Sequence, residues 1–240
     1  MEYDSLDILY TRIAHLNLSS FTFGIWPNRP QQKKTSLWKD EKGLVSLFST
    51  LYDFTLLSNL TLDIPAFGIS TKELKSLSLA LRGMHQLSSF SLELSKFDPD
   101  RRFQGLRSLL SSLKEIPKLA SFGLICKGEE LCDEEVELIT SNLGEYKKPL
   151  ETLELSFCQT RNLGNKSLLA MQNGLRNLLS LKSLTLLFGP RNIFDKKTGF
   201  ELLEVLSLLR NLEEIKLGFP SRNMPSNFDS LLNKLGVIGI

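Results

Sequence analysis

Short runs of alternating apolar and polar residues recur along this chain at nearly constant spacing. Each run begins with a leucine, here position 1, and carries large apolar residues at positions 4, 6 and 8, with mostly small or polar residues between them. Alternation with a period of two predicts a short β-strand that buries one face. The seven runs are 18–25, 57–64, 87–94, 119–126, 150–157, 181–188 and 212–219.

The stretches between these runs have the apolar spacing of a helix. Leu74, Leu77 and Leu81 lie at i, i+3 and i+7, so that they share one helical face. The same spacing recurs at 103–113, 168–178 and 200–209. The pattern therefore predicts a strand and a helix in each repeat.

Several predicted helices begin at residues that suit a helix N-terminus. Ser70 stands three residues before Glu73, Asp98 directly before a proline, and Asp133 directly before two glutamates. Such side chains accept hydrogen bonds from the first free amides or favour the positive end of the helix dipole. We interpret the acidic run 129–137 in this way rather than as a metal site.

The repeat length indicates the architecture. From the second run onwards the lead leucines are 30, 32, 31, 31 and 31 residues apart. A fixed period in this range is typical of a solenoid. Parallel strands alternating with helices resemble the leucine-rich-repeat family, in its long-repeat, ribonuclease-inhibitor-like class. The expected fold is an α/β horseshoe of about seven repeats of about 31 residues, with strands on the concave face and helices on the convex face.

The chain departs from the family at one position. The family places an asparagine or cysteine three residues after the last strand leucine, where hydrogen bonds link successive turns. Only Cys158 matches here, because the other runs carry Pro65, Ser95, Lys127, Gly189 or Pro220. We therefore expect a divergent member without the asparagine ladder, in which the apolar residue at position 8 anchors the turn.

We expect a single domain over residues 1–240. A capping helix is predicted within residues 1–17, from the apolar face at 6, 9, 10 and 13, and the repeats occupy 18–234. The first repeat is longer by a basic, proline-containing loop at 26–38. Residues 235–240 fit a shortened eighth strand, whose apolar, uncapped edge would be a template for another chain.

Composition narrows the expected setting and partners. The net charge of +2 gives no reason to expect nucleic acid binding, and no apolar run reaches the length of a membrane span. The N-terminus lacks the features of a signal peptide, and the three cysteines form no disulfide framework. We expect an intracellular, reducing compartment, with the cytoplasm favoured and an organelle or cytoskeletal assembly left open. Cys126 and Cys158 are interpreted as small buried apolar residues.

Two surfaces are candidates for partner binding besides the small, hydroxyl-rich concave face, which is either a groove for a protein segment or merely a crowded sheet surface. One is the terminal strand, with Leu235, Val237, Ile238 and Ile240. The other is a rim of basic residues in the loops after the strands, which is either a docking edge for an acidic partner or ordinary solvated charge. Its members are Arg29, Lys96, Lys127, Arg161, Arg191 and Arg222.

The sequence offers little for catalysis. His15 and His85 belong to separate repeats, and no metal-spaced cluster, phosphate loop or nucleophile elbow occurs. Asp63 and Glu93 share position 7 of adjacent strands, but an open face would not tune a carboxylate pair. We expect no cofactor, metal or small-molecule substrate.

The sequence is most consistent with a non-catalytic scaffold or adaptor that binds other protein subunits in a larger assembly. A regulator of an enzyme, either a GTPase-activating or an inhibitory repeat protein, is the alternative. For GTPase activation, Arg29 is the one candidate for an assisting arginine. A substrate receptor of a ubiquitin ligase is a further alternative.

Overall fold

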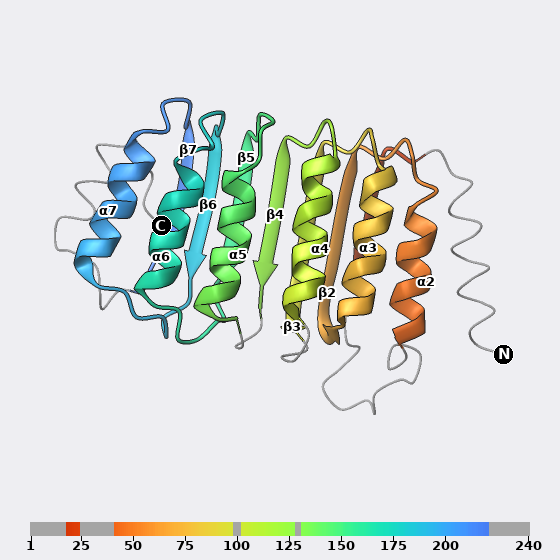
Figure 1. The fold of residues 1–240 in the computed structure, drawn as a ribbon, viewed down its shortest axis with the longest axis horizontal. Helices are drawn as coiled ribbons and strands as arrows, with labels where there is room; N and C mark the ends of the chain where they lie inside the picture. The colour runs from red at the N-terminus through yellow and green to blue at the C-terminus, as the bar shows by residue number, and fades with distance from the viewer. Residues whose placement is uncertain (1–17, 25–40, 98–101, 128–130, 221–240) are drawn as a thin grey trace. The chain divides into compact units, whose positions relative to one another are not determined.

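The computed structural model describes residues 18–24, 41–97, 102–127 and 131–220, with side chains outside 41–42, 65–68, 95–97 and 102. Contacts between Cα atoms divide the chain into two compact units, Met1–Leu119 and Ala120–Ile240. Each unit is built from strands that alternate with helices (Figure 1).

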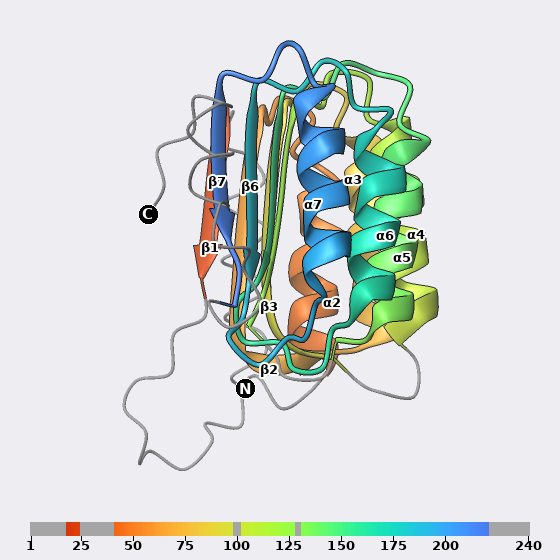
Figure 2. The ribbon, with the colours of Figure 1, turned by 90° about the vertical axis from the view of Figure 1, so that its left-hand side faces the viewer.

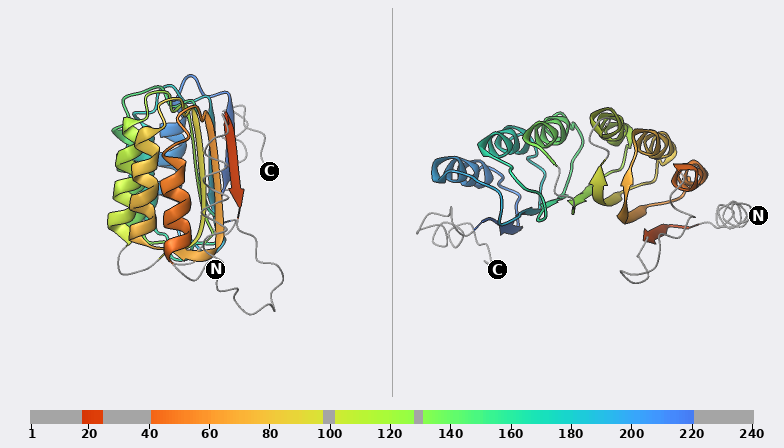
Figure 3. Two further views of the ribbon diagram at one scale, coloured as in Figure 1. Left: turned by 90° about the vertical axis from the view of Figure 1, so that its right-hand side faces the viewer. Right: turned by 90° about the horizontal axis from the view of Figure 1, so that it is seen from below.

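The first unit contains three parallel strands and three helices among its described residues. The strands pair in chain order, and the helices lie together on one side of them (Figure 3). In chain order the elements are β1 (Ser20–Gly24), α2 (Glu41–Leu51), β2 (Asn59–Ile69), α3 (Thr71–Gly83), β3 (Ser89–Phe97) and α4 (Arg102–Glu115).

The second unit repeats this plan with four parallel strands and three helices in its described part. Here too the helices lie on a single side of the strands (Figure 2). The elements are β4 (Ser121–Cys126), α5 (Asp133–Gly144), β5 (Thr152–Phe157), α6 (Asn165–Leu175), β6 (Ser183–Phe188), α7 (Lys196–Ser207) and β7 (Glu214–Gly218).

Strand register follows the sequence repeat residue for residue. Thr152 pairs with Ser183, and Ser183 pairs with Glu214, so equivalent positions of successive repeats stand side by side. At the entrance to each pairing one carbonyl accepts two amides from the next repeat, over 2.7–3.1 Å. The carbonyls that form this joint belong to Ser19, Ser58, Ala120, Glu151 and Lys182.

The core lies between the strands and the helices of each unit. Positions 4, 6 and 8 of β2, which are Leu60, Leu62 and Ile64, are buried. Opposite them Leu74, Leu77 and Leu81 of α3 are also buried. Each such side chain contributes roughly 2 kcal/mol when it leaves water, which is why period 2 and period 3.6 patterns determine these elements. The predicted α/β repeat fold is thereby confirmed.

The helix starts agree with the sequence in part. Ser70 caps α3 in a capping box: its hydroxyl accepts from the Glu73 amide at 3.3 Å, and the Glu73 carboxylate accepts from the Ser70 amide at 2.6 Å. The cap of α5 is Cys132 rather than Asp133. Asp98 lies outside the described residues.

One burial prediction is wrong. Cys126 is buried as expected, but Cys158 is exposed. Cys126 occupies position 8 of its run, on the core side of the strand, whereas Cys158 stands one residue further, at position 9. Because successive strand residues face opposite sides, this single step moves the thiol out of the core.

Three predicted features fall on residues that the structure does not describe. These are the capping helix in 1–17, the basic loop at 26–38 and the terminal strand at 235–240. They therefore stay predictions, as does the single-domain organisation.

Candidate interaction surfaces

The strands of the second unit present one face that its helices leave uncovered (Figure 2). Thr152, Ser183 and Glu214 form one row across it, and the Ser183 hydroxyl donates to the Glu214 carboxylate at 3.1 Å. We call this surface, made by positions 3, 5 and 7 of each run, the strand face. Position 5 adds a further row, in the order Gly123, Glu154, Thr185 and Lys216.

The carboxyl end of this strand face is more apolar. Ile125 and Leu187 are half-buried there, and Ser156 lies between them in the register. Gly218 completes the row on β7, where a Cβ atom would come within 3.0 Å of the Leu187 side chain. A larger residue at position 218 would therefore displace Leu187. In this unit the strand face combines hydroxyls, isolated charges and an apolar margin.

The strand face of the first unit is more polar. Ser20, Asn59 and Ser89 share one row, and Gly24, Asp63 and Glu93 share another. The predicted neighbourhood of Asp63 and Glu93 is thus real, since their Cα atoms are register partners and both residues are half-buried.

The basic rim is described at three of its six positions. Lys127 and Arg191 are exposed and Arg161 is half-buried. They occupy the connections that follow β4, β6 and β5, so that the structure brings them to one edge of the same parallel sheet. The rim side chains of Arg29, Lys96 and Arg222 lie outside the description, and so do all four residues of the predicted terminal strand, Leu235, Val237, Ile238 and Ile240.

A buried asparagine beside this rim was missed by the sequence analysis. Asn192 is 2 % exposed, and its side-chain oxygen accepts from the Leu163 amide at 3.1 Å. Its amide nitrogen lies 3.5 Å from the hydroxyl of Thr160, itself 1 % exposed. An asparagine link between successive turns therefore exists here, although it lies further along the loop than the family position. Its only sequence signal is a polar residue at the same loop site as Arg161.

Asp133 also links two repeats. Its carboxylate accepts from the amide of Gly164 at 2.9 Å and from the hydroxyl of Ser167, both at the start of the next helix. A carboxylate there satisfies amides that the helix leaves free. The predicted helix N-terminal chemistry is thus present, but it serves α6 rather than α5.

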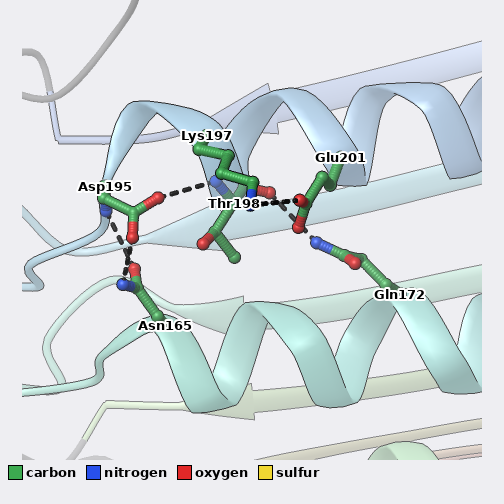
Figure 4. Close-up of polar contacts among 6 residues, drawn as sticks. All are labelled: Asn165, Gln172, Asp195, Lys197, Thr198 and Glu201. Carbon is green, nitrogen blue, oxygen red and sulfur yellow. Dashed lines mark hydrogen bonds and ion pairs between the residues drawn. The ribbon is translucent and has the colours of Figure 1, made fainter.

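The start of α7 is tied to the start of α6 in a similar way (Figure 4). The Asp195 amide donates to the side-chain oxygen of Asn165 at 2.8 Å, and the Asn165 amide group donates back to the Asp195 carboxylate. Asp195 also caps α7 by accepting from the Thr198 amide at 2.7 Å, which holds the pKa of its carboxyl below the usual range. Gln172 of α6 donates to the Thr198 carbonyl at 3.0 Å. These contacts stabilise the repeat and leave no group placed for chemistry.

The described residues offer no assembled reaction centre. His85 is exposed in the turn after α3, and His15 is outside the description. Within the described ranges no group of three or more metal-binding side chains occurs. No helix there is long and apolar enough to cross a bilayer.

Comparison with known proteins adds little beyond the fold. No family model matches the sequence, and no curated protein matches it. Among solved structures 48 chains match. One is a chain of the crystal structure of the Rad7 and Elc1 complex in yeast, with 15 % identity and a TM-score of 0.40 over 98 % of this chain and 71 % of that chain. Similarity at this level leaves the function to be argued from the chain itself.

Proposed function

We propose that this chain is a non-catalytic protein-interaction scaffold or adaptor, built as a divergent leucine-rich-repeat domain of the long-repeat class. In this proposal it is a subunit of a larger intracellular assembly. Its partners are other proteins, and no cofactor, metal, nucleic acid or small-molecule substrate is required.

The strand face carries this proposal. Parallel sheets are normally covered on both sides, because both faces of their strands are apolar. Here the uncovered side bears half-buried or exposed Thr152, Ser183 and Thr185, which do not need a second layer of helices. A solvated parallel face without an assembled reaction centre among the described residues suits the binding of another protein.

The dimensions of the strand face support the same reading. Four paired strands span about 14 Å at the usual spacing between strands. An α-helix with its side chains measures about 10–12 Å across. One unit is therefore wide enough for a helix or an extended segment of a partner, with Ile125 and Leu187 available for apolar contact.

The basic rim and the terminal strand are included as secondary contacts. Lys127 and Arg191 border the apolar margin of the strand face, where they would attract an acidic partner. Leu235, Val237, Ile238 and Ile240 would pair with another chain as an added strand.

The test is the native size of the endogenous protein after gentle lysis, with mass spectrometry of the co-eluting proteins. We expect elution in a large, salt-resistant complex. Thr152→Arg/Thr185→Arg should elute near the 27.2 kDa of the chain alone, because two bulky charges would block the strand face. The matched control Asn173→Arg/Glu204→Arg places the same side chains on exposed helix positions and should stay in the complex. A wild-type monomer, or a complex that tolerates arginines on the strand face, would refute the proposal.

A further inference from the structure

The outer surface of α3 and α4 in the first unit concentrates positive charge. Lys72 and Lys75 of α3 and Arg107 of α4 are exposed. We call this surface, completed by Leu79 and Phe103, the α3/α4 face. Among the described residues no carboxylate forms an ion pair with these three cations. The chain as a whole has a net charge of only +2, so this density is local.

The two helices lie directly against each other, which places these residues on one surface. The Ser78 hydroxyl donates to the Ser108 carbonyl at 2.8 Å. Near the other end, a Cβ atom at Gly105 would lie 2.8 Å from the Leu74 side chain, so the backbones approach closely. With Ser78 beside Ser108, Lys75 and Arg107 lie at neighbouring levels of adjacent helices.

The acidic residues nearby do not neutralise this surface. Glu73 is 4 % exposed and is engaged in the capping box with Ser70. Glu115 is already paired with Arg82, with an Nε to Oε1 distance of 3.4 Å.

Two large apolar side chains are exposed among the cations. Leu79 is 61 % exposed and lies on α3 four residues after Lys75, on the same helical face. Phe103 is 40 % exposed in the first turn of α4, one repeat length after Lys72. An apolar pair surrounded by unpaired cations is the complement of a segment with an apolar stripe and acidic flanks.

We propose that the α3/α4 face binds an acidic amphipathic segment of a partner protein. Leu79 and Phe103 contact the apolar stripe of that segment, and Lys72, Lys75 and Arg107 pair with its carboxylates. This surface is separate from the strand face and adds a second docking position to the scaffold proposed above.

A membrane surface fits these residues less well. Interfacial helices bury an apolar face about 5–10 Å deep and keep their charges on the other side. On α3 the cations share the outward side with Leu79, since the opposite side, with Leu74 and Leu77, is committed to the core. Burial of Leu79 in lipid would also bring Glu115 towards anionic headgroups.

The test uses the full chain and a fluorescent helical peptide of about 18 residues, five helical turns, with a leucine stripe flanked by glutamates. Fluorescence anisotropy gives the Kd for this peptide and for a scrambled peptide of the same composition. Vesicles containing phosphatidylserine are the lipid probe. The variants are Lys75→Glu/Arg107→Glu and Leu79→Ser, with Lys196→Glu/Arg210→Glu as the charge-matched control at exposed positions of the other unit.

We expect the amphipathic peptide to bind more tightly than the scrambled one, with an affinity that falls as salt rises. Reversal of Lys75 and Arg107 should weaken binding about tenfold, because exposed pairs are each worth a fraction of a kcal/mol and both become repulsive. Leu79→Ser should weaken it several-fold, and the control should not change it. Melting curves confirm that each variant is folded.

Unchanged peptide affinity in Lys75→Glu/Arg107→Glu would overturn the inference, and so would the absence of peptide binding. Vesicle binding without peptide binding would also overturn it and identify the face as a lipid surface. If Thr152→Arg/Thr185→Arg abolishes peptide binding while Lys75→Glu/Arg107→Glu does not, the peptide binds the strand face. That result removes this inference and leaves the proposed function standing.

Discussion

At the scale of single residues, three cysteines in one chain have three different environments. Cys158 is exposed, Cys126 is buried, and Cys132 is half-buried at the start of α5. Burial raises the pKa of the Cys126 thiol strongly, and burial together with the neighbouring Glu134 raises that of Cys132 to about 11. Only the thiolate attacks electrophiles, so reactivity should differ among them.

We predict that iodoacetamide at pH 8 modifies Cys158 first, Cys132 much more slowly and Cys126 only after unfolding. Mass spectrometry of digested samples over time measures each rate. Modification in denaturant is the control and should make the three rates similar. Alkylation of Cys126 in the folded chain as fast as that of Cys158 would contradict the burial described here.

A second prediction concerns Asp195 and pH. Its carboxyl pKa is lowered mainly because the Thr198 amide donates to it, with a smaller contribution from Asn165. A group with a lowered folded pKa stabilises the fold at pH values above its ordinary pKa, and this contribution is lost as the pH falls through the lowered value. The wild type should therefore melt above Asp195→Asn at pH 7, and the difference should shrink below about pH 4.

The matched variant for that measurement is Glu204→Gln, an exposed carboxyl later in the same helix. Its melting temperature should track the wild type across the range. A gap between wild type and Asp195→Asn that stays constant down to pH 2 would show that the charge of Asp195 does not contribute.

At the scale of elements, adjacent helices are held together by small residues. Gly174 of α6 lies so close to α5 that an added Cβ atom would come within 2.4 Å of the Thr140 carbonyl oxygen. Backbone on one side of the contact leaves nothing that rotates away. Gly199 of α7, in contrast, has open space around the position of a Cβ atom.

We predict that Gly174→Ala lowers the free energy of unfolding by about 1–3 kcal/mol, the usual cost of overpacking. Gly199→Ala should raise it by up to about 1 kcal/mol, because alanine is the better helix former. Urea titration followed by circular dichroism measures both. Equal effects of the two substitutions would mean that α5 and α6 are not in close contact at Gly174.

The elements were predictable from sequence because burial on one face imposes a local period. Leu74, Leu77 and Leu81 show the helix before any tertiary contact is known. The loops have no such period, so the inward turn of Asn192 and the outward turn of Cys158 were not predictable. The α3/α4 face escaped for another reason: Leu79 counts as apolar in any pattern, and only its exposure in the structure separates it from the core residue Leu77.

At the scale of the whole molecule, association should depend on charge at the rim as well as on the shape of the strand face. We predict that Lys127→Glu/Arg191→Glu lowers the salt concentration at which the native complex dissociates, because attraction to an acidic partner becomes repulsion. Sizing of lysates across a salt series measures this. Arg176→Glu/Arg210→Glu, exposed at helix ends away from the rim, should leave the profile unchanged. A profile identical to wild type for the rim variant would restrict the interface to other surfaces.

The carbonyl joints at the strand entrances have a consequence for how such a chain changes over evolutionary time. Each joint, such as Glu151 with the amides of Lys182 and Ser183, requires the two repeats to arrive in step. Loss of one residue within a repeat would shift every later strand by one place and turn its core side outward. Loss or duplication of a complete repeat would preserve every joint. Relatives of this chain are therefore expected to differ in length by whole repeats, with smaller insertions restricted to the loops.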